Sequence, residues 1–194
     1  MGSREPSAYG TRIAYQAAYE AARAGIVVVS GMARGLDARA HRGALDAGGK
    51  TIAVLGAGLD VAYPRENLDL LAAIGREGLL LSEFPPGTRP TKWSFPARNR
   101  IIAGLARCLL VVEGRIQGGT QTTADWMLAQ GRTVLAVPGR IDEPVAMGPN
   151  LLIREGATPY FCPGDLLRLF GLAWDGVDPA EKRPAGEPAA RRHE

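Results

Sequence analysis

The chain has 194 residues, of which 46% are hydrophobic, and this length predicts one domain with a buried core. Its formal net charge of +3 is only mildly basic, so it permits a nucleic-acid partner without requiring one. No stretch resembles a transmembrane helix or a signal peptide, and Cys108 and Cys162 lack metal-ligand spacing. We therefore expect a cytoplasmic protein with no membrane attachment, no metal site and no cofactor.

Short apolar runs alternate with helical patterns along most of the chain. Runs that are apolar on both faces are typical of parallel strands covered on two sides. The expected strands are residues 26–30, 51–55, 79–82, 109–113 and 133–137. The expected helices are residues 7–24, 38–47, 66–76, 99–105, 122–130 and 165–170.

The order of these elements predicts the fold class. Repeated strand–helix–strand units favour an α/β, Rossmann-like doubly wound fold, a mainly parallel sheet with helices on both faces. Plausible helix caps are Asp37, Asn67 and Thr122. Ligands of such sheets bind at the carboxyl ends of the strands.

The two ends of the chain differ in character from its centre. We expect a Rossmann-like DNA-binding domain over residues 1–174 and a disordered tail or linker over residues 175–194, which mix proline, alanine and charge. Gly2, Ser3 and Arg4 read as a loop that should follow a strand, yet only Met1 precedes them. Either the first central strand is missing, or Met-Gly-Ser is a vector scar.

The most informative stretch is Phe95-Pro-Ala-Arg-Asn-Arg-Ile-Ile-Ala-Gly104. It joins an aromatic ring to arginines at a helix start. Glycine-rich turns at residues 31–35, 56–58 and 118–120 lie at expected strand-to-helix junctions, where backbone N–H groups favour anions. Arginines near such turns indicate a phosphate-bearing ligand, and a stacking aromatic indicates a nucleic acid or a nucleotide.

Structural roles compete with this interpretation. Arg98 and Arg100 could instead form salt bridges, for example to Glu83 or Glu113. Phe95 could fill the core and leave Lys92 merely solvated. His41 follows Asp37 by four residues, so a structural hydrogen bond between them is favoured over catalysis.

The motifs do not favour an enzyme. There is no Ser-His-Asp arrangement, no paired-carboxylate spacing and no lysine in the Walker position. Glu83 and Glu113 are the only carboxylates that acid–base chemistry could use. The alternative function is a nucleoside-monophosphate phosphoribohydrolase-like enzyme that uses the Gly118, Gly119 and Thr120 loop, although no glutamate follows at the catalytic spacing.

Several long motifs resemble one known family. They include Ser30-Gly-Met-Ala-Arg-Gly-Leu-Asp37, Tyr63-Pro-Arg-Glu-Asn67, the stretch 95–104 and Ala136-Val-Pro-Gly139. Together they resemble the DNA-processing protein A family, also called DprA or Smf, over residues 2–172. From this resemblance we expect the given residues to lack the family's first strand and its additional small domains, and Gln117 stands where members commonly carry a basic residue.

The resemblance implies a function as well as a fold. It implies a single-stranded DNA-binding protein of natural transformation that dimerises and helps load RecA recombinase onto incoming DNA, with no established enzymatic activity. Residues 151–170 are our expected dimer surface. The expected DNA-binding residues are Gly2, Ser3, Arg4, Arg34, Gly35, Arg65, Lys92, Phe95, Arg98, Asn99, Arg100, Gly118, Gly119 and Thr120.

Overall fold

A computed structural model describes residues 1–116 and 118–176 of the chain. Gln117 and nearly all of the expected tail at 175–194 therefore lie outside the described residues. The strands are β1 (Val28–Ser30), β2 (Thr51–Val54), β3 (Leu79–Leu81), β4 (Cys108–Val111), β5 (Thr133–Ala136) and β6 (Thr158–Pro159). The α-helices are α1 (Ala8–Arg23), α2 (Leu36–Asp46), α3 (Leu68–Glu77), α4 (Ser94–Leu105), α5 (Gly119–Ala129), α6 (Met147–Arg154) and α7 (Pro163–Leu167).

Parallel strand pairing confirms the expected α/β fold. β1, β2 and β3 form one three-stranded parallel sheet, and β4, β5 and β6 form another. Each predicted apolar run overlaps a strand. The strands are short, and β2, β4 and β5 each contain at least two buried residues, which agrees with a sheet that helices cover on both faces.

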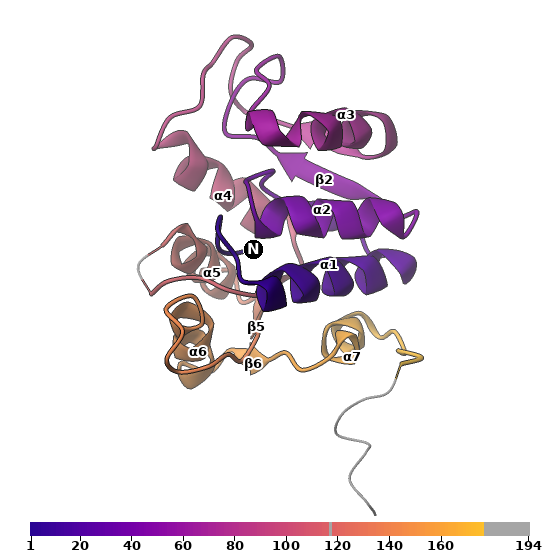
Figure 1. Cartoon of the computed structure of the whole chain (residues 1–194), viewed down its shortest axis with the longest axis vertical. Coiled ribbons are helices and arrows are strands. Elements are labelled where there is room, and N and C mark those ends of the chain that lie inside the picture. Colours follow the sequence, from indigo (N-terminus) through magenta and orange to yellow (C-terminus); the bar gives the residue numbers. More distant parts are fainter. Residues whose placement is uncertain (117, 177–194) are drawn as a thin grey trace, which may run out of the picture.

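The helices cover the strands in layers. In Figure 1, α3, α2 and α1 follow one another from top to bottom. α2 and α3 contact β2, α1 contacts α2 and β1, and α4 contacts β1 and β2. α1 packs through a row of small residues, which includes Ala14, Ala17 and Ala21. Because the helices of parallel units run back along the strands, their N-termini gather at the carboxyl ends of the strands.

Among the described residues, the strands are hydrogen-bonded as two separate three-stranded sheets. β1 and β4 each have one strand partner, and their free edges both line an apolar cavity of about 570 Å³. Met1 occupies the end of this space, where its amino group donates to the Leu110 carbonyl at 2.8 Å. Gly2 then forms a parallel bridge with Glu113. The first residues of the chain thus lie between the two sheets, near the N label in Figure 1.

Several predicted helix boundaries were wrong. α4 begins at Ser94 rather than at residue 99, so Phe95 and Pro96 lie in its first turn. α2 and α5 also begin earlier than expected, with Gly35 and Gly118 at their N-caps, so Asp37 and Thr122 are not caps. Pro96 fits because a first-turn residue has no intrahelical N–H bond to lose.

Two elements and one cap interaction were missed or misassigned. The sequence predicted neither α6 nor β6, which are only eight and two residues long. Asn67 does precede α3, but its side-chain amide donates to the Met32 and Ala33 carbonyls instead of capping the helix. No helix in residues 1–116 and 118–176 is long and apolar enough to cross a bilayer.

Candidate nucleic-acid interface

A pocket of about 260 Å³ opens beyond the carboxyl ends of β1 and β2. Gly31 follows β1, and Gly56 follows β2 by two residues, so the backbone of both turns forms part of the pocket wall. Three of the expected DNA-binding side chains line this pocket: Arg4, Arg34 and Phe95. These three residues therefore lie together at the carboxyl edge of the sheet, where the sequence predicts ligand binding.

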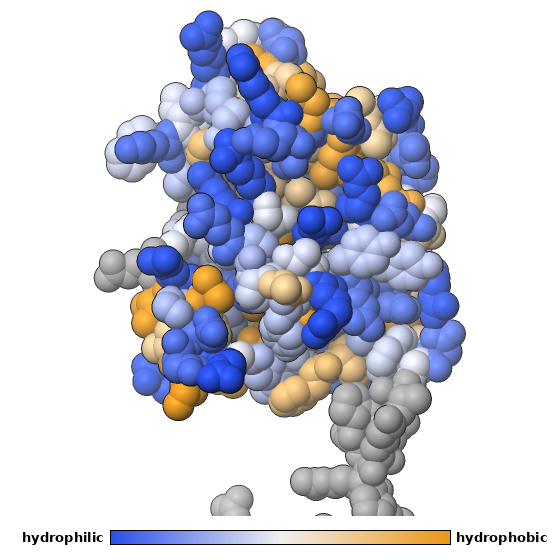
Figure 2. Space-filling view, viewed as in Figure 1, coloured by the Kyte–Doolittle hydropathy of each residue, from blue (hydrophilic) through white to orange (hydrophobic). Residues whose placement is uncertain are grey.

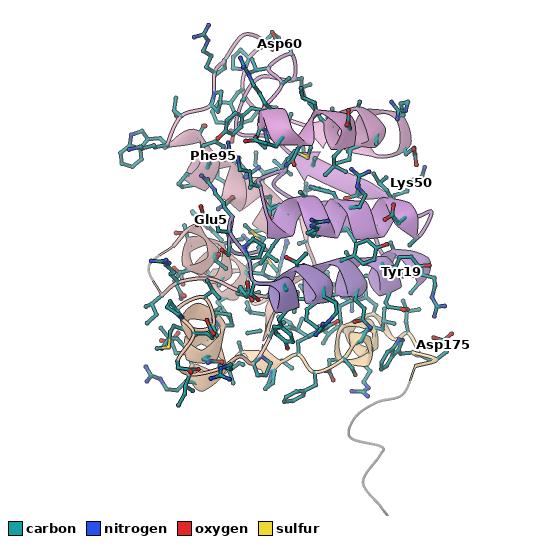
Figure 3. All side chains as sticks on the ribbon, in the orientation of Figure 1. Glu5, Tyr19, Lys50, Asp60, Phe95 and Asp175 are labelled. Atoms are coloured by element: carbon teal, nitrogen blue, oxygen red, sulfur yellow. The ribbon has the colours of Figure 1, made fainter. Side chains whose placement is uncertain are left out.

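Phe95 lies in the pocket wall, half-buried, and it belongs to none of the hydrophobic clusters of the core. Its ring centroid lies 5.7 Å from that of Tyr63, with the two planes tilted by 35°. The Arg4 guanidinium carbon lies 5.0 Å from the Phe95 centroid. In Figure 3, Phe95 and Glu5, another residue of the pocket wall, lie on the same edge of the molecule.

Two close contacts explain the glycines at Gly56, in the pocket wall, and at Gly35, beside it. A Cβ on Gly56 would lie 2.9 Å from the ring of Phe95, so a side chain there would push the ring away. Gly35 has a φ of 74° and a Cβ on it would lie 2.5 Å from the Ser3 carbonyl oxygen. Only glycine combines that conformation with so close an approach. The Ser3 carbonyl also accepts from the Leu36 N–H at 3.2 Å, which joins the N-terminal segment to the start of α2.

Arg34 reaches the pocket from the turn between β1 and α2. Its guanidinium forms an ion pair of 2.6 Å with Glu66, and both side chains are more than half exposed. An exposed pair of this kind contributes little to stability. A phosphate group can therefore replace the carboxylate at small cost.

Arg98 and Asn99 hold the pocket together from inside. Arg98 is 3% exposed and donates to the carbonyls of Gly31, which follows β1, and of Val54, the last residue of β2. Its Nε donates to Asn99 Oδ1 at 2.9 Å. Within the described residues Arg98 does not form the ion pair with Glu83 or Glu113 that was the structural alternative for Arg98 and Arg100, and its burial prevents a direct phosphate contact in this conformation.

Arg100 behaves differently from its neighbour two residues away. It is exposed and pairs with Glu83, which is the structural alternative that the sequence left open. The Glu113 carboxylate instead accepts hydrogen bonds from the Ser7 backbone and hydroxyl at the start of α1. Both carboxylates are thus engaged, and neither lines the pocket.

Other expected residues lie outside the pocket wall. Lys92 and Arg65 are exposed and have no ion pair within the described part of the chain. Gly118, Gly119 and Thr120 precede or begin α5 and are not part of the pocket wall. The Asn99 amide of α4 donates to the Gly119 carbonyl at 3.3 Å. The alternative enzyme built on this loop gains no support from the geometry.

His41 has a structural role. It is fully buried, and its Nδ1 lies 2.7 Å from the hydroxyl of Thr51, which in turn donates to the Val28 carbonyl. The expected hydrogen bond to Asp37 was wrong, because that carboxylate accepts from the Ala33 N–H. Burial lowers the pKa of His41 to about 4, so the ring is neutral at pH 7. Among the described residues, no three His, Cys, Asp or Glu side chains lie close enough to hold a metal.

Tyr63 is the pocket residue that the sequence reasoning missed. The motif at residues 63–67 was noted, but only its arginine was counted as a site residue. Tyr63 is 37% exposed, lines the pocket and contacts Phe95. The signal available in the sequence was an aromatic residue, Tyr63, in the loop that follows the glycine turn at residues 56–58.

Comparisons with known proteins bear on the family and the fold. A sequence model of the DNA recombination-mediator protein A family matches residues 1–171. The chain belongs to this family. The DNA processing protein DprA of Bacillus subtilis is a relative that is 44% identical over 166 residues, which are 86% of this chain and 56% of that protein. The chain spans about half the length of the curated relatives it matches.

Solved structures of the DNA recombination-mediator protein A family share the fold. The X-ray structure of DprA from Streptococcus pneumoniae superposes with a TM-score of 0.82 at 42% identity, covering 87% of this chain and 59% of that one. DNA processing protein A from Helicobacter pylori, whose single-stranded DNA-binding mode has been solved, matches with a TM-score of 0.81 at 30% identity. That match covers 88% of this chain and 77% of the other.

Proposed function

We propose that this chain carries the single-stranded DNA-binding part of a recombination mediator, in a domain over residues 1–174. The observation that supports this most is the pocket in which Arg4 and Arg34 flank the paired rings of Phe95 and Tyr63. Cations beside aromatic faces suit a polymer that alternates phosphates with flat bases. The single-stranded DNA binding of the Helicobacter pylori relative supports the same choice.

The proposed roles follow from exposure. Arg4, Arg34, Lys92 and Arg65 offer positive charge to phosphates, and Phe95 with Tyr63 offers a stacking surface. In the proposal the remaining expected residues have positioning or rim roles. These residues are Gly2, Ser3, Gly35, Arg98, Asn99, Arg100, Gly118, Gly119 and Thr120.

The finer parts of the proposal concern partners. RecA loading onto DNA taken up in natural transformation, and formation of a homodimer, follow from the family resemblance. Within the expected dimer surface at 151–170, Leu152, Leu166 and Leu167 belong to the buried core of the protein, whereas Phe161 is 68% exposed. Phe161 is thus the apolar anchor that this surface offers to a second copy.

Binding of an oligo-dT strand tests the proposed function. Arg34→Ala and Lys92→Ala should each weaken binding several-fold in fluorescence anisotropy, because each removes a phosphate contact. Glu66→Gln should strengthen binding by a few-fold, because it releases Arg34 from an exposed ion pair that is worth at most about 1 kcal/mol.

The controls separate charge from folding. Glu77→Gln changes an exposed carboxylate at the end of α3, outside the pocket wall and the expected dimer surface, and should bind as the unsubstituted chain does. Melting curves should show that all four variants stay folded. If Arg34→Ala and Lys92→Ala both retain full affinity, the pocket is not the DNA site.

A further inference from the structure

A second groove lies next to the pocket, across the start of α2. It has a volume of about 440 Å³ and crosses the N-terminal parts of α1, α2 and α3. Gly35 and Glu66 are both in the wall of the groove. Arg34, which precedes Gly35 in the sequence and forms the ion pair with Glu66, belongs to the pocket. The pocket and the groove are therefore continuous neighbours that meet at the Arg34–Glu66 pair.

Two arginines of α2 line this groove. Arg39 and Arg42 are exposed and lie one helical turn apart, so they project from the same face of the helix. Within the described residues neither guanidinium has an ion pair or a hydrogen bond. Other surface arginines, such as Arg34 and Arg100, do pair with a carboxylate. In Figure 2, hydrophilic side chains gather over this face of α1 to α3.

The charged side chains of the groove wall give it a net positive charge on the side of α2. Glu66 is neutralised by Arg34, which leaves Asp69 as the one unpaired carboxylate among the described residues of the groove wall. Arg39 and Arg42 therefore outnumber it. Unpaired guanidinium groups in a concave surface are suited to bidentate binding of phosphate oxygens.

We propose that this groove is a second phosphate subsite, which binds the same DNA strand after it leaves the pocket. Arg39 and Arg42 contact phosphates of the nucleotides that pass over the start of α2. The inference rests on the proposed function, because it extends the same strand from one site to the next. It adds a length requirement, since a strand must be long enough to cross the Arg34–Glu66 pair before it reaches Arg39.

The test compares two lengths of oligo-dT, about five and about twenty nucleotides. The double variant Arg39→Ala, Arg42→Ala should weaken binding of the long strand on the order of fivefold and leave the short strand unaffected. With the long strand, the slope of log affinity against log salt should fall by about 1.4, because two phosphate contacts are lost. The variant Arg39→Lys, Arg42→Lys should retain most of the slope, because it keeps both charges.

The matched control is Arg76→Ala, Lys50→Ala, which removes the same charge from exposed positions outside the pocket, the groove and the expected dimer surface. If the control weakens long-strand binding as much as the α2 variant, the effect is one of net charge and the subsite is overturned. An equal loss for both strand lengths also overturns it. If the unsubstituted chain binds neither strand, the proposed function itself fails, whereas binding that is insensitive to Arg39 and Arg42 overturns only the subsite.

Discussion

The side chains of α4 show how differently neighbouring residues of one type are used. Arg98 is buried and donates hydrogen bonds to two backbone carbonyls at the carboxyl ends of β1 and β2, whereas Arg100 is exposed and pairs with Glu83. Both arginines stand in one motif, and nothing in their residue type separates them. Their position on the helix decides, because a rotation of two residues turns a side chain from the sheet toward solvent.

At the scale of single residues, His41 makes stability depend on pH. Its folded pKa of about 4 lies below the usual value of 6.5, so the unfolded chain takes up the proton first as pH falls. The neutral His41 ring should therefore make its full contribution to the free energy of unfolding above pH 6.5. On acidification toward pH 4 the protein should lose about 3 kcal/mol of this free energy. Urea unfolding at several pH values measures this loss.

The control for the pH prediction is His41→Gln, which keeps a polar group near Thr51 but does not titrate. This variant should be less stable at pH 7, and its stability should change less between pH 6.5 and pH 4. An equally steep loss in the variant would assign the pH dependence to other groups.

At the scale of elements, α4 joins the two strands that carry the pocket. Arg98 connects it to the ends of β1 and β2, and Asn99 connects it to the start of α5. Phe95, one turn earlier, then lies against the turn that follows β2. The pocket wall is therefore built from several elements whose mutual positions depend on one buried guanidinium.

Arg98→Ala should destabilise the protein far more than Arg100→Ala. The first change leaves the buried carbonyls of Gly31 and Val54 without a donor, at a cost of about 1–3 kcal/mol each, whereas the second removes an exposed ion pair worth at most about 1 kcal/mol. Thermal unfolding of the two variants gives the comparison. Equal melting temperatures would show that Arg98 does not stabilise the ends of the strands.

At the scale of the whole molecule, the main feature is the space between the two sheets. The free edges of β1 and β4 face the same cavity, and α1 lines it with small residues such as Ala14, Ala17 and Ala21. The Met1 amino group lies at its end, where burial lowers the pKa of that amine. An extended segment directly before Met1 would run parallel to both strands and would replace the buried amine by a peptide N–H.

Adding a segment of about four alternating apolar residues before Met1 should therefore stabilise the domain. Burial of two or three large side chains would raise the melting temperature by about 5–15 °C. A glycine–serine segment of the same length is the control, because it adds the same backbone without the apolar side chains. Equal melting temperatures for the two extended chains would mean that the cavity does not accept a strand.

The sequence by itself determined the fold class, the strand positions and the edge of the sheet at which the pocket lies. It could do so because apolar runs, glycine turns and first-turn residues are local properties of the chain. Only the tertiary structure decided which cations face solvent, that Tyr63 joins Phe95, and that Glu66 holds Arg34. These contacts join residues 32 positions apart in both cases, and burial and pairing over such separations depend on how helices and strands pack rather than on any local pattern.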